Sequence, residues 1–268
     1  MTLTPISPSL CGLVSGSLLV ALLLGGCASN PTGGANFVLM SENRELEIGK
    51  EEHEKLMKSS QVYQDARLQA YVDQIGKKLA AISHRPDLEY HFTIIDSPDI
   101  NAFALPGAYV YVNRGLIDYL TTEAQLAAVL GHEIAHVVLN HSQQRVNQAT
   151  GVALGTVLLD TVLSANGADK STRAVAATGA AAAGTVGLIL PYSRKAELQS
   201  DQLGTLYMAR AGYNPEESIK LWERFSAWRI KKGESESPEF LRTHPLDQSR
   251  ILALKSFLPT AQREYKPR

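Results

Sequence analysis

Cysteine is scarce in this chain. Only two occur among its 268 residues, Cys11 and Cys27, and both lie near the N-terminus. The rest of the chain therefore offers no thiolate to act as a nucleophile or metal ligand, and no pair that could form a disulfide. Any catalytic site after residue 27 must use other chemistry, and the redox compartment is left undetermined.

An excess of charge of either sign is also missing. The formal net charge is −1 and the pI is about 6.7. Domains that bind nucleic acid usually carry a basic patch or stripe, so the sequence predicts no nucleic-acid partner. No internal repeat is visible, and we expect no helical-repeat extension after residue 257.

Basic residues are absent from positions 1–12, although the apolar run at 13–24 has the length of a signal-peptide core. This run is too short for a comfortable membrane span. It ends in Leu24-Gly25-Gly26-Cys27, which resembles a bacterial lipobox with Cys27 as the lipidated residue. No aspartate follows Cys27, which favours a lipid anchor in the outer membrane, facing the periplasm. Because signal n-regions are usually basic, an uncleaved anchor or a simple secretory signal is the alternative.

These features predict four segments: a lipoprotein signal peptide at 1–26, a flexible tether at 27–41, one catalytic domain at 42–257 and a C-terminal tail at 258–268. Periodicity predicts helices at 42–58 and 61–82 and strands at 90–96, 100–105 and 108–113. In the first helix we expect His53 to be exposed to solvent. In the second, Tyr71, Ile75 and Leu79 share one face.

The residues His132-Glu133-Ile134-Ala135-His136 read H-E-x-x-H within a predicted helix. Positions i and i+4 share a helix face, so both imidazoles can reach one metal ion. Glu133 is offset by about 100° and can act as a general base beside the metal-bound water. The alternative is an ordinary helix that happens to carry these side chains.

The context of this motif favours a metal site. Thr122-x-x-Gln125 is a capping-box signature at the start of the helix. Apolar residues then nearly surround the helix, which predicts that it is buried. Buried histidine and glutamate side chains destabilise a fold unless they are paired or ligated. A bound zinc ion would provide that compensation.

Catalytic zinc usually has three protein ligands and one open position. Leu139 and Ser142 occupy the glycine and histidine positions of the longer metzincin motif, which excludes that class. His141 is expected to be a solvated histidine at the helix end. Glu197 could supply the third ligand, and Asp201, one turn later, could accept a hydrogen bond from a ligand histidine. The alternative for both is a solvated acidic helix face.

Four segments match the motifs of one protein family in order and spacing. They are N-A-F-A-L-P-G at 101–107, A-Q-L-A-A-V-L-G-H-E-I-A-H at 124–136, S-R-K-A-E-L-Q-S-D at 193–201 and T-H-P-L-D-Q-S-R at 243–250. The chain resembles the HtpX and CAAX-prenyl-protease family of zinc metallopeptidases, in particular its periplasmic lipoprotein branch. Ser200 stands where that family usually has alanine.

The resemblance implies an α+β, mostly helical, zincin-like fold of the gluzincin type, with a small β-sheet beside the active-site helix. It also implies a role for each matching residue. One zinc ion would be bound by His132, His136 and Glu197, with Glu133 as general base and acid and Asp201 behind a ligand. Two further catalytic residues are implied: Asn101, which would reach in from an edge strand, and His244, which would lie over the open zinc position and either stabilise the oxyanion, the slightly favoured role, or cap the resting site. Structural roles are the alternative for Asn101 and His244.

These inferences predict a zinc-dependent endopeptidase that hydrolyses misfolded or unassembled proteins of the bacterial envelope. Its partners would be peptide and protein substrates, and the membrane through lipid on Cys27. The alternative is an envelope chaperone or assembly factor with a structural or latent zinc site. The apolar stretch at 151–190 is expected to form a helical hairpin over the active site or in the core, with membrane insertion as the alternative.

Overall fold

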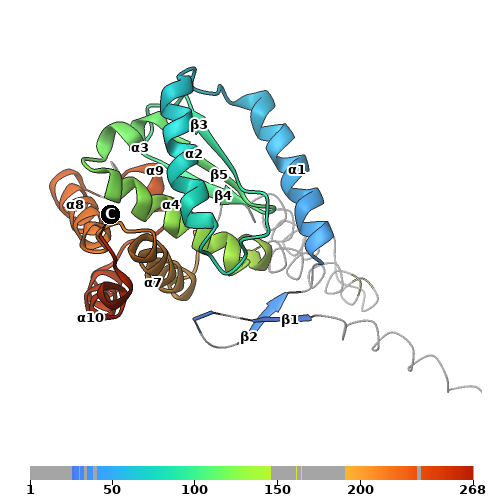
Figure 1. The fold of residues 1–268 in the computed structure, drawn as a ribbon. Helices are drawn as coiled ribbons and strands as arrows, with labels where there is room; N and C mark the ends of the chain where they lie inside the picture. The colour runs from blue at the N-terminus through green and yellow to red at the C-terminus, as the bar shows by residue number, and fades with distance from the viewer. Residues whose placement is uncertain are drawn as a thin grey trace, which may run out of the picture.

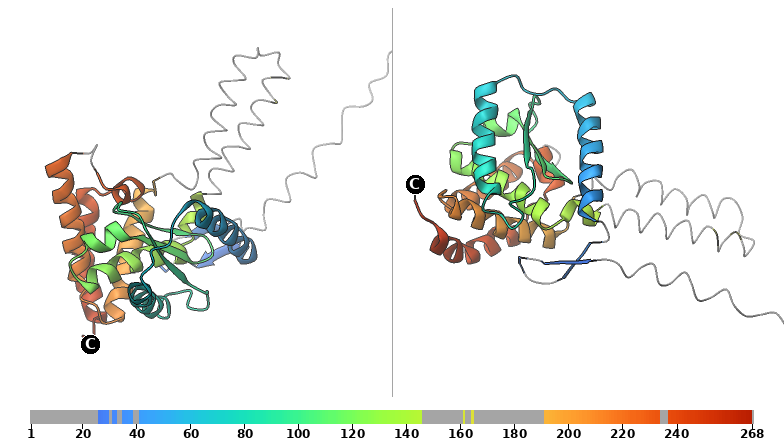
Figure 2. Two further views of the ribbon diagram at one scale, coloured as in Figure 1. Left: turned by 90° about the horizontal axis from the view of Figure 1, so that it is seen from above. Right: turned by 45° about the vertical axis from the view of Figure 1, so that its right-hand side comes forward.

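The computed structural model describes residues 26–29, 31–32, 35–38, 41–145, 161, 164, 191–233 and 237–267. Helices surround a three-stranded sheet, and the central helix α4 (Glu123–Val138) runs below that sheet in the views of Figure 1 and of Figure 2, right. The architecture is therefore α+β and mostly helical, which confirms the predicted fold class.

The three-stranded sheet consists of β3 (His91–Ile95), β4 (Ala102–Leu105) and β5 (Tyr109–Asn113). The strand order is β3-β5-β4, with β3 parallel and β4 antiparallel to β5. β4 is therefore an edge strand. Its residues alternate between buried and half-buried, because successive side chains of a strand point to opposite faces. The predicted strands are all present, each slightly shorter than expected.

The central helix α4 (Glu123–Val138) is buried from Gln125 to its C-terminus, as predicted. Thr122 is its N-cap, and the Thr122 hydroxyl accepts a hydrogen bond from the Gln125 backbone N–H at 3.1 Å. The Gln125 side chain accepts from the Thr121 backbone N–H at 3.1 Å instead of reaching Thr122. The predicted N-cap is therefore present, but the returning hydrogen bond from the Gln125 side chain involves Thr121 and not Thr122.

Helix α7 (Arg194–Arg210) crosses α4 at two glycines. A Cβ atom at Gly131 would lie 2.8 Å from the Gly204 carbonyl oxygen, and one at Gly204 would lie 2.7 Å from the Gly131 carbonyl carbon. Neither distance is possible for a real side chain, so only glycine at both positions permits this backbone approach. The close crossing brings the functional faces of the two helices together.

Two N-terminal helices, α1 (Glu42–Ser59) and α2 (Ala66–Ala80), stand on either side of the sheet in the right-hand view of Figure 2. α2 begins later than predicted because Asp65 caps it, while Val62 bridges to Ile95 of β3. Its core-facing residues are Val72, Ile75 and Leu79, whereas Tyr71 is 38% exposed. Tyr71, Ile75 and Leu79 do follow one another at successive turns of the helix, but of the three only Ile75 and Leu79 are buried.

The prediction that His53 of α1 is exposed was also wrong. His53 is half-buried, its Nδ1 lies 2.7 Å from the Tyr111 hydroxyl, and its ring stacks on Tyr109 at 4.6 Å between ring centroids. The helix periodicity placed His53 on a polar face but did not show that β5 packs against that face.

The remaining helices complete the shell. They are α3 (Arg114–Tyr119), α8 (Glu216–Lys232), α9 (Glu239–Thr243) and α10 (Gln248–Glu264). α10 continues through Pro259, so residues 258–264, predicted as a tail, are helical. Ala261 is fully buried, and Arg210 of α7 pairs with Glu264 at 3.4 Å. Packing on neighbouring helices thus maintains the helix beyond the proline.

The predicted tether at 27–41 contains two short strands. β1 (Gly26–Ser29) pairs antiparallel with β2 (Ala35–Val38), and the sequence between them, Asn-Pro-Thr-Gly-Gly, is rich in residues that favour turns. The expected signal-peptide core at 13–24 lies outside the described residues, as does the expected hairpin at 151–190 apart from positions 161 and 164. Within the described part of the chain, no helix is both long and apolar enough to cross a membrane.

Candidate metal and catalytic site

Three buried side chains from two helices meet in the core. His132 and His136 extend from α4 and Glu197 from the first turn of α7, whose N-cap is Ser193. The two histidine Nε2 atoms lie 3.0 Å apart. Glu197 Oε2 lies 3.5 Å from His132 Nε2, and Glu197 Oε1 lies 3.4 Å from His136 Nε2. The structure therefore brings together the three residues that the sequence predicted as ligands.

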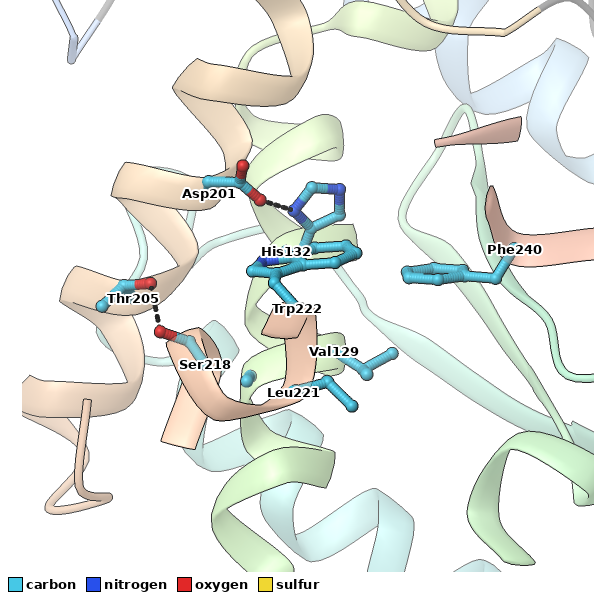
Figure 3. A pocket seen from close by; sticks show the side chains of 9 residues that line it. Val129, His132, Asp201, Thr205, Ser218, Leu221, Trp222 and Phe240 are labelled. Atoms are coloured by element: carbon cyan, nitrogen blue, oxygen red, sulfur yellow. Dashed lines mark hydrogen bonds and ion pairs between the residues drawn. The ribbon is translucent and has the colours of Figure 1, made fainter. Parts of the chain in front are cut away.

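Asp201 lies behind this cluster, where the sequence predicted it. Its Oδ1 atom is 3.1 Å from His132 Nδ1, the ring nitrogen opposite the one that faces Glu197. A carboxylate at that position fixes the histidine tautomer that leaves Nε2 available to a metal. The interaction is drawn in Figure 3.

Arg250 of α10 connects the two acidic residues. Its Nε and Nη2 atoms donate to the two carboxylate oxygens of Asp201 at 2.8 Å each, and its Nη1 atom lies 2.7 Å from Glu197 Oε2. The side chain is only 1% exposed. Two parallel bonds to one carboxylate fix both position and orientation, so Arg250 holds Asp201 against His132 and Glu197 in place.

His244 and Glu133 lie on the side of the cluster that the three expected ligands leave open. The ligand atoms of His132, His136, Glu197 and His244 all lie within 4.8 Å of one another. His244 Nε2 lies 3.4 Å from Glu133 Oε1. Neither of these two atoms, nor Glu133 Oε2, has a hydrogen-bond partner among the described residues. Three buried polar atoms beside the cluster are therefore available to a ligand.

The electrostatics of the site follow from burial and nearby carboxylates. Burial disfavours charge on His132, yet Asp201 and Glu197 outweigh it and raise its pKa to about 9. Burial lowers the pKa of His136 well below its usual value and that of His244 to about 3.

Burial opposes ionisation of Glu197, but Arg250 and then His244 hold its pKa well below the usual range. The neutral imidazoles of His136 and His244 and the carboxylate of Glu197 are thus in the protonation states that metals bind.

This set of donors fits a divalent metal. Two imidazole nitrogens and one carboxylate oxygen are a ligand set of catalytic zinc sites. Charged and polar side chains buried without partners destabilise a fold, and here several converge on one point. A cation at that point would pair the buried atoms, and His132 would release its proton on binding it. The group could therefore hold a metal ion.

A cleft opens from the cluster toward the edge strand. Its volume is about 450 Å³, and it is lined by Asn101, His244, Tyr192, residues of β4 and residues of α1. Asn101 directly precedes β4, and its buried Oδ1 atom has no hydrogen-bond partner among the described residues. Asn101 therefore borders the cleft, as the predicted role at an edge strand requires.

His141 was predicted wrongly as a solvated residue. It is 2% exposed, and its Nδ1 lies 3.0 Å from His136 Nδ1. Helix α4 ends at Val138, and Asn140 adopts a positive φ of 56°. This left-handed residue interrupts the helix, and His141 beyond it contacts the Nδ1 side of His136. Burial lowers its pKa to about 4, so it faces His136 as a neutral ring.

Tyr192 was not predicted from the sequence. Its ring stacks on His136 at 3.8 Å between centroids, and its hydroxyl lies 2.9 Å from Ser142 Oγ, which donates to the Ala104 carbonyl of β4. The Arg145 guanidinium lies 3.6 Å from the Tyr192 ring centroid. One feature of the sequence could have indicated that Tyr192 lies near the site: it directly precedes Ser193, the N-cap of the helix that carries Glu197.

Aromatic residues close the opposite side of His132. Trp222 of α8 stacks on Phe240 of α9 at 5.6 Å between ring centroids, and both rings lie within 6.4 Å of the His132 ring. Figure 3 shows them around a cavity of about 10 Å³, enough for no more than about one water molecule. The cluster is therefore packed against aromatic residues on this side, while His244 lines the cleft.

Comparisons with known proteins agree with this geometry. Residues 66–258 match the model of peptidase family M48. Mitochondrial metalloendopeptidase OMA1 of Schizosaccharomyces pombe is 33% identical over 192 residues, which cover 72% of this chain and 53% of that protein. The beta-barrel assembly-enhancing protease of Escherichia coli K12 is 30% identical over 219 residues, 79% of this chain and 43% of that protein. The chain thus spans about half the length of these relatives, or less.

Proposed function

Because the chain belongs to peptidase family M48, we propose that it is a zinc-dependent endopeptidase that hydrolyses peptide bonds of bacterial envelope proteins. The observation that carries this proposal is the cluster of His132, His136 and Glu197 with Glu133 nearby, all buried next to His244, which lines an open cleft. These residues would hold one zinc ion, with Asp201 and Arg250 orienting them.

Glu133 is the residue that would move the proton. Burial raises its pKa to about 7, although the charge of His132 opposes the rise. A general base is most effective when its pKa lies near the working pH. Zinc, when bound, supplies Lewis acidity for the scissile carbonyl and lowers the pKa of water toward ~7. Glu133 then accepts the proton of the attacking water and delivers it to the departing amine nitrogen as the C–N bond breaks.

The edge strand gives the substrate a place to bind. Among the described strands β4 pairs only with β5, and residues of β4 line the same cleft as Asn101 and His244. An extended peptide can add to such an edge through main-chain hydrogen bonds. That mode of binding requires a locally unfolded segment, so misfolded or unassembled envelope proteins are the substrates that we propose.

The location that we propose is the periplasmic face of the outer membrane, with lipid on Cys27. The lipobox-like sequence before Cys27 supports this, as do two relatives described as beta-barrel assembly-enhancing proteases, in Escherichia coli and Vibrio cholerae. The lipoprotein branch that the motifs resemble is proposed on the same grounds, since the family match supports M48 as a whole.

Metal dependence and substrate state together test the proposal. Purified protein should cleave a destabilised variant of a model protein faster than its folded parent, lose this activity on chelation and regain it with zinc. Activity that persists in the metal-free protein would exclude the zinc mechanism, and equal cleavage of folded and destabilised substrates would exclude strand addition. If the purified protein prevents aggregation but never cleaves, the chaperone alternative holds.

A further inference from the structure

Helix α1 borders the cleft although it lies outside the residues that match the family model. That match begins at residue 66, whereas α1 ends at Ser59. Nevertheless Glu52, Lys55, Leu56 and Ser59 line the same cavity as Asn101 and His244. One wall of the catalytic cleft is therefore supplied by a segment that the family model does not include.

This wall is fixed to the sheet at several points. Gly49 packs on the turn between β4 and β5, where a Cβ atom would lie 2.1 Å from the Pro106 carbonyl oxygen. The buried Glu45 carboxylate accepts two hydrogen bonds from Arg85, at 2.9 and 3.1 Å. The His53–Tyr111 contact described above fixes the helix one turn beyond Gly49. α1 is thus held as a rigid wall.

The two walls present apolar side chains to the cleft. On β4, Phe103, Ala104 and Leu105 line the cavity. Ala104 is buried in the core, whereas Phe103 and Leu105 alternate with it, are half-buried and provide the larger apolar side chains. Leu56 lines it from α1. The charged residues of this wall, Lys55 and Glu52, pair with each other at 2.7 Å. The space between Leu56 and β4 is therefore suited to an uncharged, bulky group.

We propose that Leu56, Phe103 and Leu105 form a subsite that selects a large aliphatic or aromatic side chain of the substrate. The occupant is an extended peptide, because the subsite is continuous with the catalytic groups and one wall is the edge strand that such a peptide would join. The cavity of about 450 Å³ is large enough for a side chain and adjoining backbone. The inference rests on the proposed peptidase function and adds the determinant of its specificity.

Binding to an inactive protein tests the subsite without turnover. The full chain carrying Glu133→Gln is loaded with zinc and titrated with fluorescent peptides in which each position in turn is alanine, aspartate, leucine or phenylalanine. At one position, peptides with leucine or phenylalanine should bind at least ~10-fold more tightly than the peptide with alanine, since a filled apolar pocket discriminates by such factors. In the Glu133→Gln protein that also carries Leu56→Ala, this ratio of affinities should fall below ~3-fold, with zinc content and circular dichroism unchanged.

Leu46→Ala is the matched control. Leu46 lies on the same helix and is 40% exposed, outside the cavity lining, so the ratio should stay at its original value. The inference is overturned if no position prefers an apolar residue, or if Leu56→Ala leaves the ratio unchanged. Tight binding of a detergent with an acyl chain, without any preference among peptides, would also overturn it. Cleavage by the Glu133-intact protein is measured separately, and its absence would overturn the proposed function alone.

Discussion

At the scale of single residues, Arg250 is the group on which the arrangement of the cluster depends most. It is buried and contacts both Asp201 and Glu197. Removing one partner of a buried ion pair leaves the other charge without compensation, at a cost of about 3–5 kcal/mol. We therefore expect Arg250→Ala to lower the free energy of unfolding by about this amount and to weaken zinc binding, as measured by denaturation and metal titration.

Arg242→Ala is the control for that change. The Arg242 side chain is 62% exposed and pairs with Glu239 on the same short helix. Exposed pairs contribute about 0–1 kcal/mol, so this variant should be nearly as stable as the wild type. An Arg250→Ala protein of unchanged stability and zinc affinity would show that Arg250 does not organise the site.

His244 is expected to restrain activity. Its Nε2 lies within ligand range of the other three cluster residues, and the Thr243 hydroxyl lies 3.0 Å from its Nδ1. A fourth protein ligand would block the position that catalysis needs. We predict that His244→Ala increases the rate of cleavage of a small peptide. A fall of ~100-fold or more would instead assign His244 to oxyanion stabilisation, and an unchanged rate would exclude both roles.

The residue types at the site could be predicted far better than their surroundings. The H-E-x-x-H spacing places two histidines on one helix face, and the later E-x-x-x-D supplies the acidic pair, because both patterns depend on helix geometry alone. The prediction for His141 was wrong because the left-handed residue Asn140 interrupts the helix, after which His141 packs against His136 instead of facing solvent. The contacts of Arg250 and Tyr192 come from packing between distant segments, which spacing along the sequence does not encode.

At the scale of elements, the crossing of α4 and α7 determines whether the ligands meet. Replacing a mid-helix glycine by alanine normally stabilises a helix by about 1 kcal/mol. Here the added methyl group at Gly204 would lie 2.7 Å from the α4 backbone, so the helices must separate. Overpacking of this kind costs about 1–3 kcal/mol. We expect Gly204→Ala to lower the melting temperature and zinc affinity together, and a raised melting temperature would contradict the close crossing.

Some boundaries of helices follow from the local sequence, whereas others depend on packing against distant segments. The start and burial of α4 follow from Thr122 and the apolar residues around the helix, and both are confirmed. Residues 61–65 were expected in a helix but run beside β3, because pairing of Val62 with Ile95 outweighs local propensity. Residues 258–264 are helical despite Pro259 because Ala261 is buried.

At the scale of the whole molecule, the prediction concerns the anchor. If Cys27 is the lipidated first residue of the mature protein, wild-type protein should fractionate with membranes and its N-terminal peptide should carry acyl chains. Cys27→Ser should release the protein, since several acyl chains give stable anchoring and their loss removes it. Mass spectrometry and fractionation measure both. A soluble mature wild-type protein that begins at another residue would refute the lipoprotein interpretation.

The assembled molecule places the cluster where three layers meet. α4 and α7 supply the expected ligands, α10 supplies the arginine that holds them, and β4 with α1 forms the cleft that leads to them. These elements span the chain from residue 42 to residue 264, so the site exists only in the folded domain. Metal binding should therefore be coupled to folding.

The central claim is that this cluster holds zinc and that Glu133 performs the proton transfer beside it. The most direct test measures zinc content and cleavage of an unfolded protein for the wild type and for Glu133→Gln. Both proteins should bind about one zinc, and the variant should be slower by ~100-fold or more because only the general base is lost. A Glu133→Gln protein that retains more than about a tenth of the wild-type rate, or a wild type that binds no zinc, would contradict the account.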